Sequence, residues 1–164
     1  MIDVAELERA IKERLRKREE VIRAVGNFAL KASQVLGPLT AILYGSYARG
    51  DFNLWSDVDV LFVVRDEVAL PRKPHKRVEL VLDLVPPGFE VHLVREGELR
   101  RALAKRAFAR AALAGAVVVL DQLGLAEELR AMGLGVEVGG RGAWRGLTGR
   151  TSPPPRQACA PRKS

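Results

Sequence analysis

The first third of the chain has an apolar period of three to four residues. Over residues 4–36 this period puts the apolar side chains on one face of an α-helix (Val4, Leu7, Ile11, Leu15, Ile22, Val25, Ala29, Ala32 and Leu36). Asp3, with Glu6 three positions later, forms a capping box that marks the helix start. Gly37-Pro38 ends the pattern, because proline cannot continue the hydrogen-bond ladder. We predict one long N-terminal helix, with a break near residue 18 as an alternative.

Short apolar runs rich in β-branched residues follow this helix. They cover residues 39–44, 58–64 and 89–94, and each has the length and composition of a strand. A glycine-containing loop joins the first two. Residues 78–85 could form a buried strand, but the prolines at 71 and 74 and the charged positions favour a helix that begins after Pro74. The pattern predicts neighbouring strands joined by a functional loop.

The second half of the chain returns to a helical pattern. It runs from Glu96 to Ala114, and the apolar residues 117–120 and a short helix to about Met132 come after it. From residue 135 onward Gly, Pro and Arg dominate, and no apolar period remains that could dock this segment against a core. The tail is therefore expected to be disordered.

These patterns divide the chain into three parts. The N-terminal helix occupies residues 1–36, one folded domain occupies residues 37–134, and the basic tail occupies residues 135–164. With 164 residues, 48% of them hydrophobic and 29% charged, the chain has the composition of a single globular domain and excludes a fully disordered or collagen-like protein.

Membrane insertion and secretion find no support in the sequence. The longest apolar stretch, residues 111–120, is half of the ~20 residues needed to cross a bilayer. The N-terminus carries acids where a signal peptide would carry bases and an apolar run. We expect a cytoplasmic protein that does not bind membranes.

The net charge of +7 would suggest a nucleic-acid partner, but the positive charges are unevenly distributed along the chain. Residues 135–164 hold six bases and one acid, whereas the other 134 residues hold 21 bases and 19 acids. A basic cluster around His75, at residues 72–77, is expected to be a solvated face. Nucleic-acid binding is therefore an expectation only for the tail, where it would be loose and dependent on salt.

Two further features of composition concern the cysteine chemistry of the chain and the growth temperature of its source. The single cysteine, Cys159, excludes an intramolecular disulfide and a zinc site built from cysteines. Asn and Gln are scarce while Arg and Glu are plentiful, a bias that fits growth at high temperature and that a GC-rich genome would also produce.

Candidate chemistry is concentrated in residues 44–64. Side chains of a strand alternate between its faces, so Asp57 and Asp59 project the same way, with Cα atoms about 6.5 to 7 Å apart. Two such carboxylates can share a pair of divalent cations in a phosphoryl or nucleotidyl displacement. Magnesium is the expected ion, because every candidate ligand is oxygen.

A glycine and a serine precede these acids at the end of the first strand. Gly45 and Ser46 enter a turn in which a missing Cβ lets backbone N–H groups approach an anion, and Arg49 is close enough in sequence to reach a triphosphate. Each element alone is more often an ordinary turn or a solvated charge. Their combination, with Gly50 and with Ser56 directly before the acids, indicates a phosphate site that faces a metal site.

The segments Gly45-Ser46 and Ser56-Asp57-Val58-Asp59, with Gly50 between them, resemble the nucleotidyltransferase signature of the DNA polymerase beta superfamily. The chain is most similar to the small stand-alone nucleotidyltransferase-domain proteins of prokaryotes and archaea, and the order of its elements extends the resemblance over residues 38–121. The resemblance implies an α/β (α+β) fold, in which helices flank a small mixed β-sheet and the acids lie at its edge. The long N-terminal helix is an addition to this minimal fold.

The resemblance also implies a third carboxylate on a neighbouring strand. Glu90 is the candidate, although the family more often has Asp there, and a charge that protects an edge strand is the alternative interpretation. Asp83 replaces it as a candidate if residues 78–85 form a strand. His92 is a candidate base or substrate contact, with simple packing as the alternative.

We therefore expect a metal-dependent nucleotidyltransferase that moves a nucleoside monophosphate, AMP in the first instance, from an NTP to a hydroxyl acceptor. Catalytic and metal-binding roles are assigned to Asp57, Asp59 and Glu90, which would hold two Mg²⁺ ions, and NTP binding to Gly45, Ser46, Arg49 and Ser56. A non-catalytic nucleotide-binding or partner-binding module is the alternative function.

Two kinds of protein partner are expected. By resemblance, small proteins of this kind often act with a separate helical protein, commonly as one half of a toxin–antitoxin pair in which the partner is modified. The apolar stripe of the N-terminal helix is longer than a core of this size can cover, which predicts a homodimer or another helical contact.

Overall fold

The computed structural model describes residues 1 and 3–139. Its centre is a five-stranded mixed sheet with the strand order β3-β2-β1-β4-β5. Strand β1 runs antiparallel to both of its neighbours, whereas β3 is parallel to β2 and β5 is parallel to β4. The strands are β1 (Leu39–Tyr44), β2 (Val58–Val64), β3 (Phe89–Arg95), β4 (Val117–Asp121) and β5 (Glu137–Val138).

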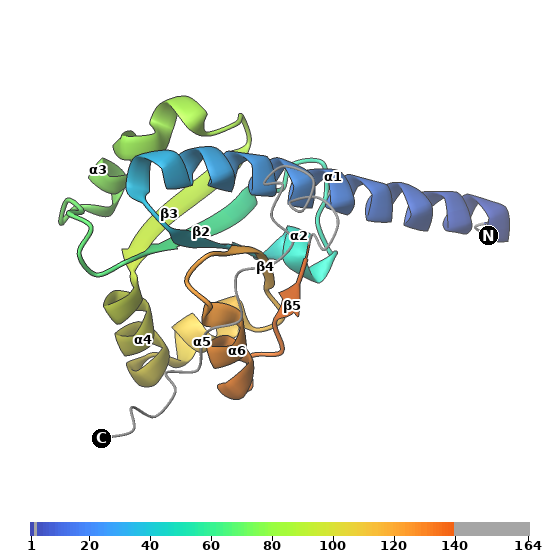
Figure 1. Ribbon diagram of the computed structural model, residues 1–164. Helices are drawn as coiled ribbons and strands as arrows, with labels where there is room; N and C mark the ends of the chain where they lie inside the picture. Colours follow the sequence, from blue (N-terminus) through green and yellow to red (C-terminus); the bar gives the residue numbers. More distant parts are fainter. Residues whose placement is uncertain (2, 140–164) are drawn as a thin grey trace, which may run out of the picture.

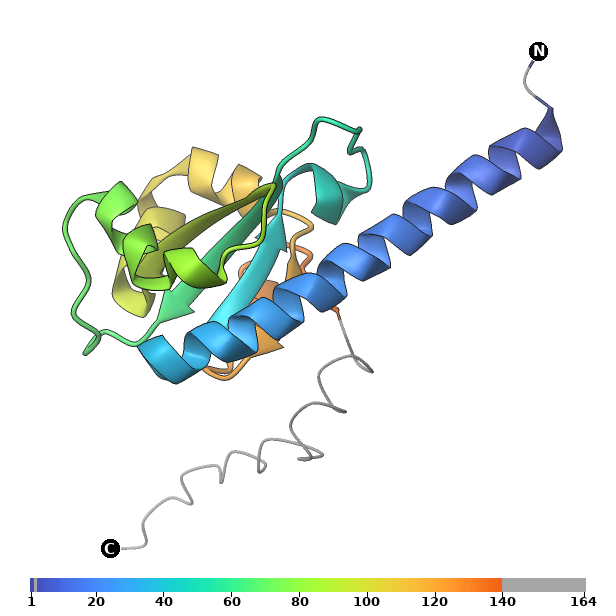
Figure 2. The same ribbon diagram turned by 90° about the horizontal axis from the view of Figure 1, so that it is seen from above.

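Helices cover both faces of this sheet. Figures 1 and 2 show α1 and α3 on one face and α4, α5 and α6 on the other, which confirms the predicted mixed sheet flanked by helices. Their bounds are α1 (Val4–Leu36), α2 (Ser46–Arg49), α3 (Pro74–Val78), the 3₁₀ helix η1 (Glu79–Leu84), α4 (Glu96–Lys105), α5 (Ala107–Leu113) and α6 (Leu125–Ala131). None of the helices in the described ranges is long and apolar enough to cross a membrane.

Helix α1 is unbroken, so the predicted long helix is confirmed and the alternative break is absent. The Asp3 carboxylate accepts a hydrogen bond from the N–H of Ala5 at one end, and Gly37 ends the helix with a φ of 82°. Its second half packs on the sheet through the fully buried Val25 and Ala29. Its first half extends beyond the sheet (Figures 1 and 2).

The predicted single helix over residues 96–114 is instead two helices, α4 and α5. They meet at Arg106, whose backbone is extended. Leu99 and Leu103 of α4 and Leu113 of α5 are all buried in the same apolar cluster. At 100° per residue, a continuous helix would also place Leu113 within about 40° of Leu99, so the apolar spacing gives no signal for the break.

Residues 74–84 are helical, as the charged positions predicted. Within this segment Val81 is fully buried, while Leu80 and Asp83 are exposed. The strand alternative is therefore excluded, and with it the reason to place Asp83 beside the candidate acids.

The folded part extends a few residues into the predicted tail. Leu134 and Val136 are buried, β5 pairs with β4, and the N–H of Gly139 donates to the carbonyl oxygen of Val118 at 3.0 Å. The sequence analysis placed residues 135–139 in the tail because so short a strand has no period of its own. The rest of the predicted tail, residues 140–164, lies outside the described residues.

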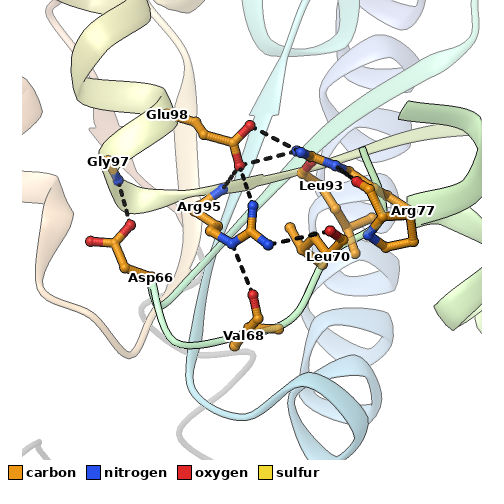
Figure 3. Close-up of polar contacts among 9 residues, drawn as sticks. Asp66, Val68, Leu70, Arg77, Leu93, Arg95, Gly97 and Glu98 are labelled. Atoms are coloured by element: carbon orange, nitrogen blue, oxygen red, sulfur yellow. Dashed lines mark hydrogen bonds and ion pairs between the residues drawn. The ribbon is translucent and has the colours of Figure 1, made fainter. Parts of the chain in front are cut away.

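A buried ion pair joins α3 to the start of α4 (Figure 3). Arg77 is 8% exposed, and its guanidinium lies 3.0 Å from the Glu98 carboxylate. The same guanidinium donates to the carbonyl oxygens of Pro71 and Leu93, at 2.6 and 3.0 Å. The solvated face predicted for residues 72–77 is therefore wrong at this position, because the last residue of that stretch points inward and finds partners there.

A second arginine completes this cluster. Arg95 donates to Glu98 at 3.2 Å and to the carbonyl oxygens of Val68 and Leu70, so it holds the loop after β2 against the β3–α4 junction (Figure 3). The N–H of Gly97 donates to Asp66 in the same loop at 2.9 Å. We call Arg77, Arg95 and Glu98 the arginine clamp.

Candidate active site

The predicted acids meet at one end of three adjacent strands. Tyr44 ends β1 and is the register partner of Asp59 in β2, and Asp59 in turn is the register partner of Glu90 in β3. Leu61, two residues after Asp59, belongs to the apolar cluster beneath α4 to α6. Since strand side chains alternate, Asp59 and Glu90 project toward the face that carries these helices.

Gly45 lies directly against the Asp59 carboxylate. The backbone of Gly45 has a φ of 77°, and a Cβ placed there would collide with the Asp59 carboxylate oxygen. Two separate constraints therefore require glycine, the left-handed backbone and the close approach of the carboxylate. The glycine turn and the acidic strand, more than ten residues apart in sequence, form one site.

The substitution Gly45→Ala is expected to damage both the fold and the site. The backbone of Gly45, with φ 77° and ψ −153°, is a conformation almost restricted to glycine and costs an L-residue about 1 to 3 kcal/mol, and the new methyl group must also displace Asp59. Urea unfolding should show a loss of at least that size. Gly37→Ala is a matched control, because Gly37 has a similar backbone, with φ 82° and ψ −174°, but has open space around it. Equal losses in the two variants would contradict the close contact with Asp59.

The carboxylate of Asp59 is in an unfavourable setting for a charge. Partial burial raises its pKa first, and the nearby Glu90 and Asp57 raise it further, while His92 and Arg49 lower it by a smaller amount. A cation bound beside Asp59 would relieve this repulsion. The electrostatics of the site therefore favour a positively charged ligand.

Tyr44 is a neighbour of the acids that sequence analysis treated only as apolar. Burial raises the pKa of its phenol to about 12, and the charges of Asp59 and Glu90 add to the effect. The hydroxyl group is thus neutral at physiological pH and can donate a hydrogen bond. Its position as the last strand residue before Gly45 is the signal that could have identified it.

The remaining residues of the signature are placed around this centre. Asp57 is exposed and directly precedes β2, and Ser46 begins α2. Arg49, at the end of α2, forms an exposed ion pair with Asp51 at 3.2 Å. It is close enough to Asp59 to lower the pKa of that carboxyl group. Both Arg49 and Ser46 thus lie on the short helix that follows the Gly45 turn.

Ser56 is engaged in the loop before β2. Its hydroxyl oxygen accepts from the N–H of Asn53 at 2.9 Å, and Asn53 also accepts from the N–H of Trp55 at 2.8 Å. Ser56 therefore closes the turn that leads into Asp57. Its assignment to nucleotide binding stays a prediction, and the turn is a role that the sequence alone did not reveal.

Glu90 and His92 form a pair on the outermost strand. Both side chains project to the same face of β3, and Glu90 Oε1 lies 3.4 Å from His92 Nε2. Asp83, in the exposed part of η1, does not join the interactions that shift the pKa of Asp59. Of the two candidates for a third carboxylate, the structure brings Glu90 to Asp59.

The donor set fits a magnesium ion that also binds a substrate. Among residues 1 and 3–139, no three His, Cys, Asp or Glu side chains are arranged to hold a metal ion by themselves. Mg²⁺ is usually held by one or two carboxylates together with substrate phosphates and water. Asp57 and Asp59 supply such carboxylates. A bound cation would relieve the charge repulsion that raises the pKa of Asp59.

The chain is similar to a known protein family over the region that contains the site. A family model described as "Nucleotidyltransferase domain" matches residues 25–114. A protein of Methanocaldococcus jannaschii that bears the provisional name of protein adenylyltransferase is 41% identical over 56 residues, which are 33% of this chain and 57% of that relative. The chain thus spans little more than half the length of this relative.

A solved structure is also similar. It is the crystal structure of a protein from Sulfolobus solfataricus, provisionally named a nucleotidyltransferase, with 22% identity and a TM-score of 0.45. The match covers 54% of this chain and 78% of that one.

The family match includes every element of the candidate site. It spans the Gly45-Ser46 turn, both aspartates and the strand of Glu90, and it covers more than half of the chain. The resemblance stated from the sequence is therefore confirmed: this chain belongs to the nucleotidyltransferase domain family.

Proposed function

We propose that this protein transfers a nucleoside monophosphate from an NTP to a hydroxyl group, with release of pyrophosphate. The observation that carries the proposal is the contact of the Gly45 backbone with the Asp59 carboxylate, beside Glu90. This contact joins a turn suited to phosphates with acids suited to a divalent cation. Membership in the nucleotidyltransferase domain family supports the same activity.

In this proposal Asp57 and Asp59 hold two Mg²⁺ ions. These ions would supply charge neutralisation at the attacking and leaving oxygens. Glu90 completes the site and accepts the proton of the acceptor hydroxyl, with His92 beside it at 3.4 Å to hold its carboxylate in place. The phenol of Tyr44 stays neutral and is available as a hydrogen-bond donor beside these acids.

The triphosphate lies in this proposal against Gly45 and Ser46, with Arg49 as its cationic contact. Arg49 is exposed, and its ion pair with Asp51 is a surface pair that costs little to exchange for a phosphate. Ser56 acts through the turn that it forms with Asn53, which fixes the approach of the chain to Asp57.

ATP is the proposed donor and a protein hydroxyl the proposed acceptor. The support is the relative from M. jannaschii, whose provisional name is protein adenylyltransferase. A small helical partner, of the kind found in toxin–antitoxin pairs, would supply the acceptor surface that the described domain does not provide by itself. A non-catalytic nucleotide-binding module is the second candidate, and the glutamate at position 90 together with its pairing to His92 favours it.

The test is incubation of the full chain with each of the four NTPs, labelled at the α-phosphate, in the presence of Mg²⁺ and extract of the source organism. The expected result is one labelled protein band that appears with ATP and requires Mg²⁺. Nucleotide binding without a labelled acceptor, across all four NTPs and with Mg²⁺ or Mn²⁺, would favour the binding module.

Glu90→Gln tests the third carboxylate within the same assay. General-base catalysis contributes typically about 10² to 10⁴-fold, so labelling should fall by at least ~10²-fold while ATP binding with Mg²⁺ is retained. Glu79→Gln is the matched control, since Glu79 is an exposed acid that pairs with Lys76 away from the site. Unchanged labelling by Glu90→Gln would remove Glu90 from the mechanism.

A further inference from the structure

The first half of α1 carries an apolar stripe without cover. Four aliphatic side chains on one face remain half or more exposed: Val4 70%, Leu7 50%, Ile11 50% and Leu15 57%. The stripe continues the face that buries Ile22, Val25 and Ala29 against the sheet, but this half of the helix lies beyond the sheet (Figure 2). Within the described part of the chain, nothing covers it.

Charges on the same half of α1 are divided by sign. Residues 3–8 hold three acids, Asp3, Glu6 and Glu8, and no base. Residues 9–18 hold six bases and one acid. A parallel pairing of two such helices would oppose acids to acids and bases to bases. In an antiparallel pairing the acidic segment of each helix lies against the basic segment of the other, at both ends of the contact.

We propose that two copies of this chain associate through an antiparallel pairing of the N-terminal halves of α1. The pairing is centred between Leu7 and Ile11, so that Val4 lies near Leu15 of the second copy. Its contacts are the same on both copies, which gives a closed dimer with twofold symmetry. This proposal is independent of the proposed enzymatic activity.

The loop between α2 and β2 enlarges the surface available to the second copy. Arg14 of α1 donates to the carbonyl oxygens of Gly50 and Phe52, at 3.1 and 2.6 Å, and so fixes this loop beside the helix. The loop presents Leu54 and Trp55, 97% and 90% exposed, next to a cavity of about 680 Å³ between itself and α1. A pair of short helices alone buries less than the ~1,200 Å² of a stable interface, and these side chains supply the additional area.

The mass of the full chain in solution tests the proposal. Light scattering coupled to size exclusion should give a dimer that dissociates on dilution. Ile11→Glu, which puts a charge at the centre of the apolar seam, should give a monomer. Phe108→Glu is the matched control, because Phe108 is 83% exposed on α5 and should leave the dimer intact. A wild-type monomer throughout the concentration range would overturn the proposal.

Variants with reversed charges test whether the partner that covers the stripe is a second copy of this chain or another molecule. Glu6→Lys/Glu8→Lys makes both segments net basic. Arg9→Glu/Lys12→Glu/Lys17→Glu leaves three bases and four acids in residues 9–18 and so makes both segments net acidic, so each variant alone should be monomeric. An equimolar mixture should restore a heterodimer, which also shows that both variants are folded. Dimers in both unmixed variants, or no association in the mixture, would overturn the charge-paired arrangement.

Discussion

Asp59→Asn is expected to reduce nucleotidyl transfer by at least ~10² to 10³-fold, the loss typical when one group that stabilises transition-state charge is removed. The asparagine would keep the shape of the side chain beside Gly45 but would remove the negative charge that a divalent cation requires. The measurement is labelled AMP transfer under saturating ATP and Mg²⁺. Binding of ATP in the presence of Mg²⁺, followed by calorimetry, should weaken in the same variant.

The stability of this variant distinguishes a lost metal ligand from a damaged fold. Burial and the charges of Glu90 and Asp57 raise the pKa of Asp59, so its charged form disfavours the folded state. For a carboxyl group with a raised pKa, stability is highest below the unfolded-state pKa and is lost as the pH rises through the folded-state pKa. Asp59→Asn escapes this loss and should melt at an equal or higher temperature at pH 7 without Mg²⁺. Transfer at the wild-type rate, or a lower melting temperature, would contradict the role given to Asp59.

The elements that carry the site were predictable because their signals are local. The Gly45-Ser46 turn follows an apolar strand, and Asp57 and Asp59 lie at the start of another. Their spacing in the sequence is therefore enough to predict a phosphate site and a metal site. What spacing does not give is the strand register. The contact of Asp59 with Gly45, and the position of Glu90 beside Asp59, depend on three strands being neighbours in this order. The resemblance to a known family supplied only the expectation that a third carboxylate lies on a neighbouring strand.

Features that depend on tertiary packing were missed for the same reason. The basic stretch around Arg77 has the composition of a solvated face, and only the approach of Glu98, 21 residues later, gives its guanidinium a buried partner. Strand β5 is too short for a period of its own and exists because β4 pairs with it. The break at Arg106 has no signal in the apolar spacing, because a continuous helix would place Leu113 on the same face as Leu99.

Glu98→Gln should be among the most destabilising substitutions of an acid in the described domain. It leaves the Arg77 guanidinium buried without its counter-charge, and removal of one partner from a buried ion pair costs about 3 to 5 kcal/mol. Because Glu98 is itself partly exposed and Arg95 loses only one of several contacts, the lower end of this range is expected. Urea unfolding at pH 7 measures the difference. Glu79→Gln, which breaks the exposed pair with Lys76, should cost at most about 0.5 kcal/mol.

The pH dependence of this loss identifies its electrostatic origin. Burial alone would raise the pKa of Glu98, but the hydrogen bonds from Arg77 and from the N–H of Arg95, together with the charges of both arginines, lower it overall. A carboxyl group with a lowered pKa contributes stability above its unfolded-state pKa and loses that contribution as the pH falls through its folded-state pKa. The gap between wild type and Glu98→Gln should therefore be full at neutral pH and shrink in acid, below the usual carboxyl range. If the difference in stability between wild type and Glu98→Gln stays constant down to the acid transition, Glu98 stabilises the fold by packing and not through its charge interactions with Arg77 and Arg95.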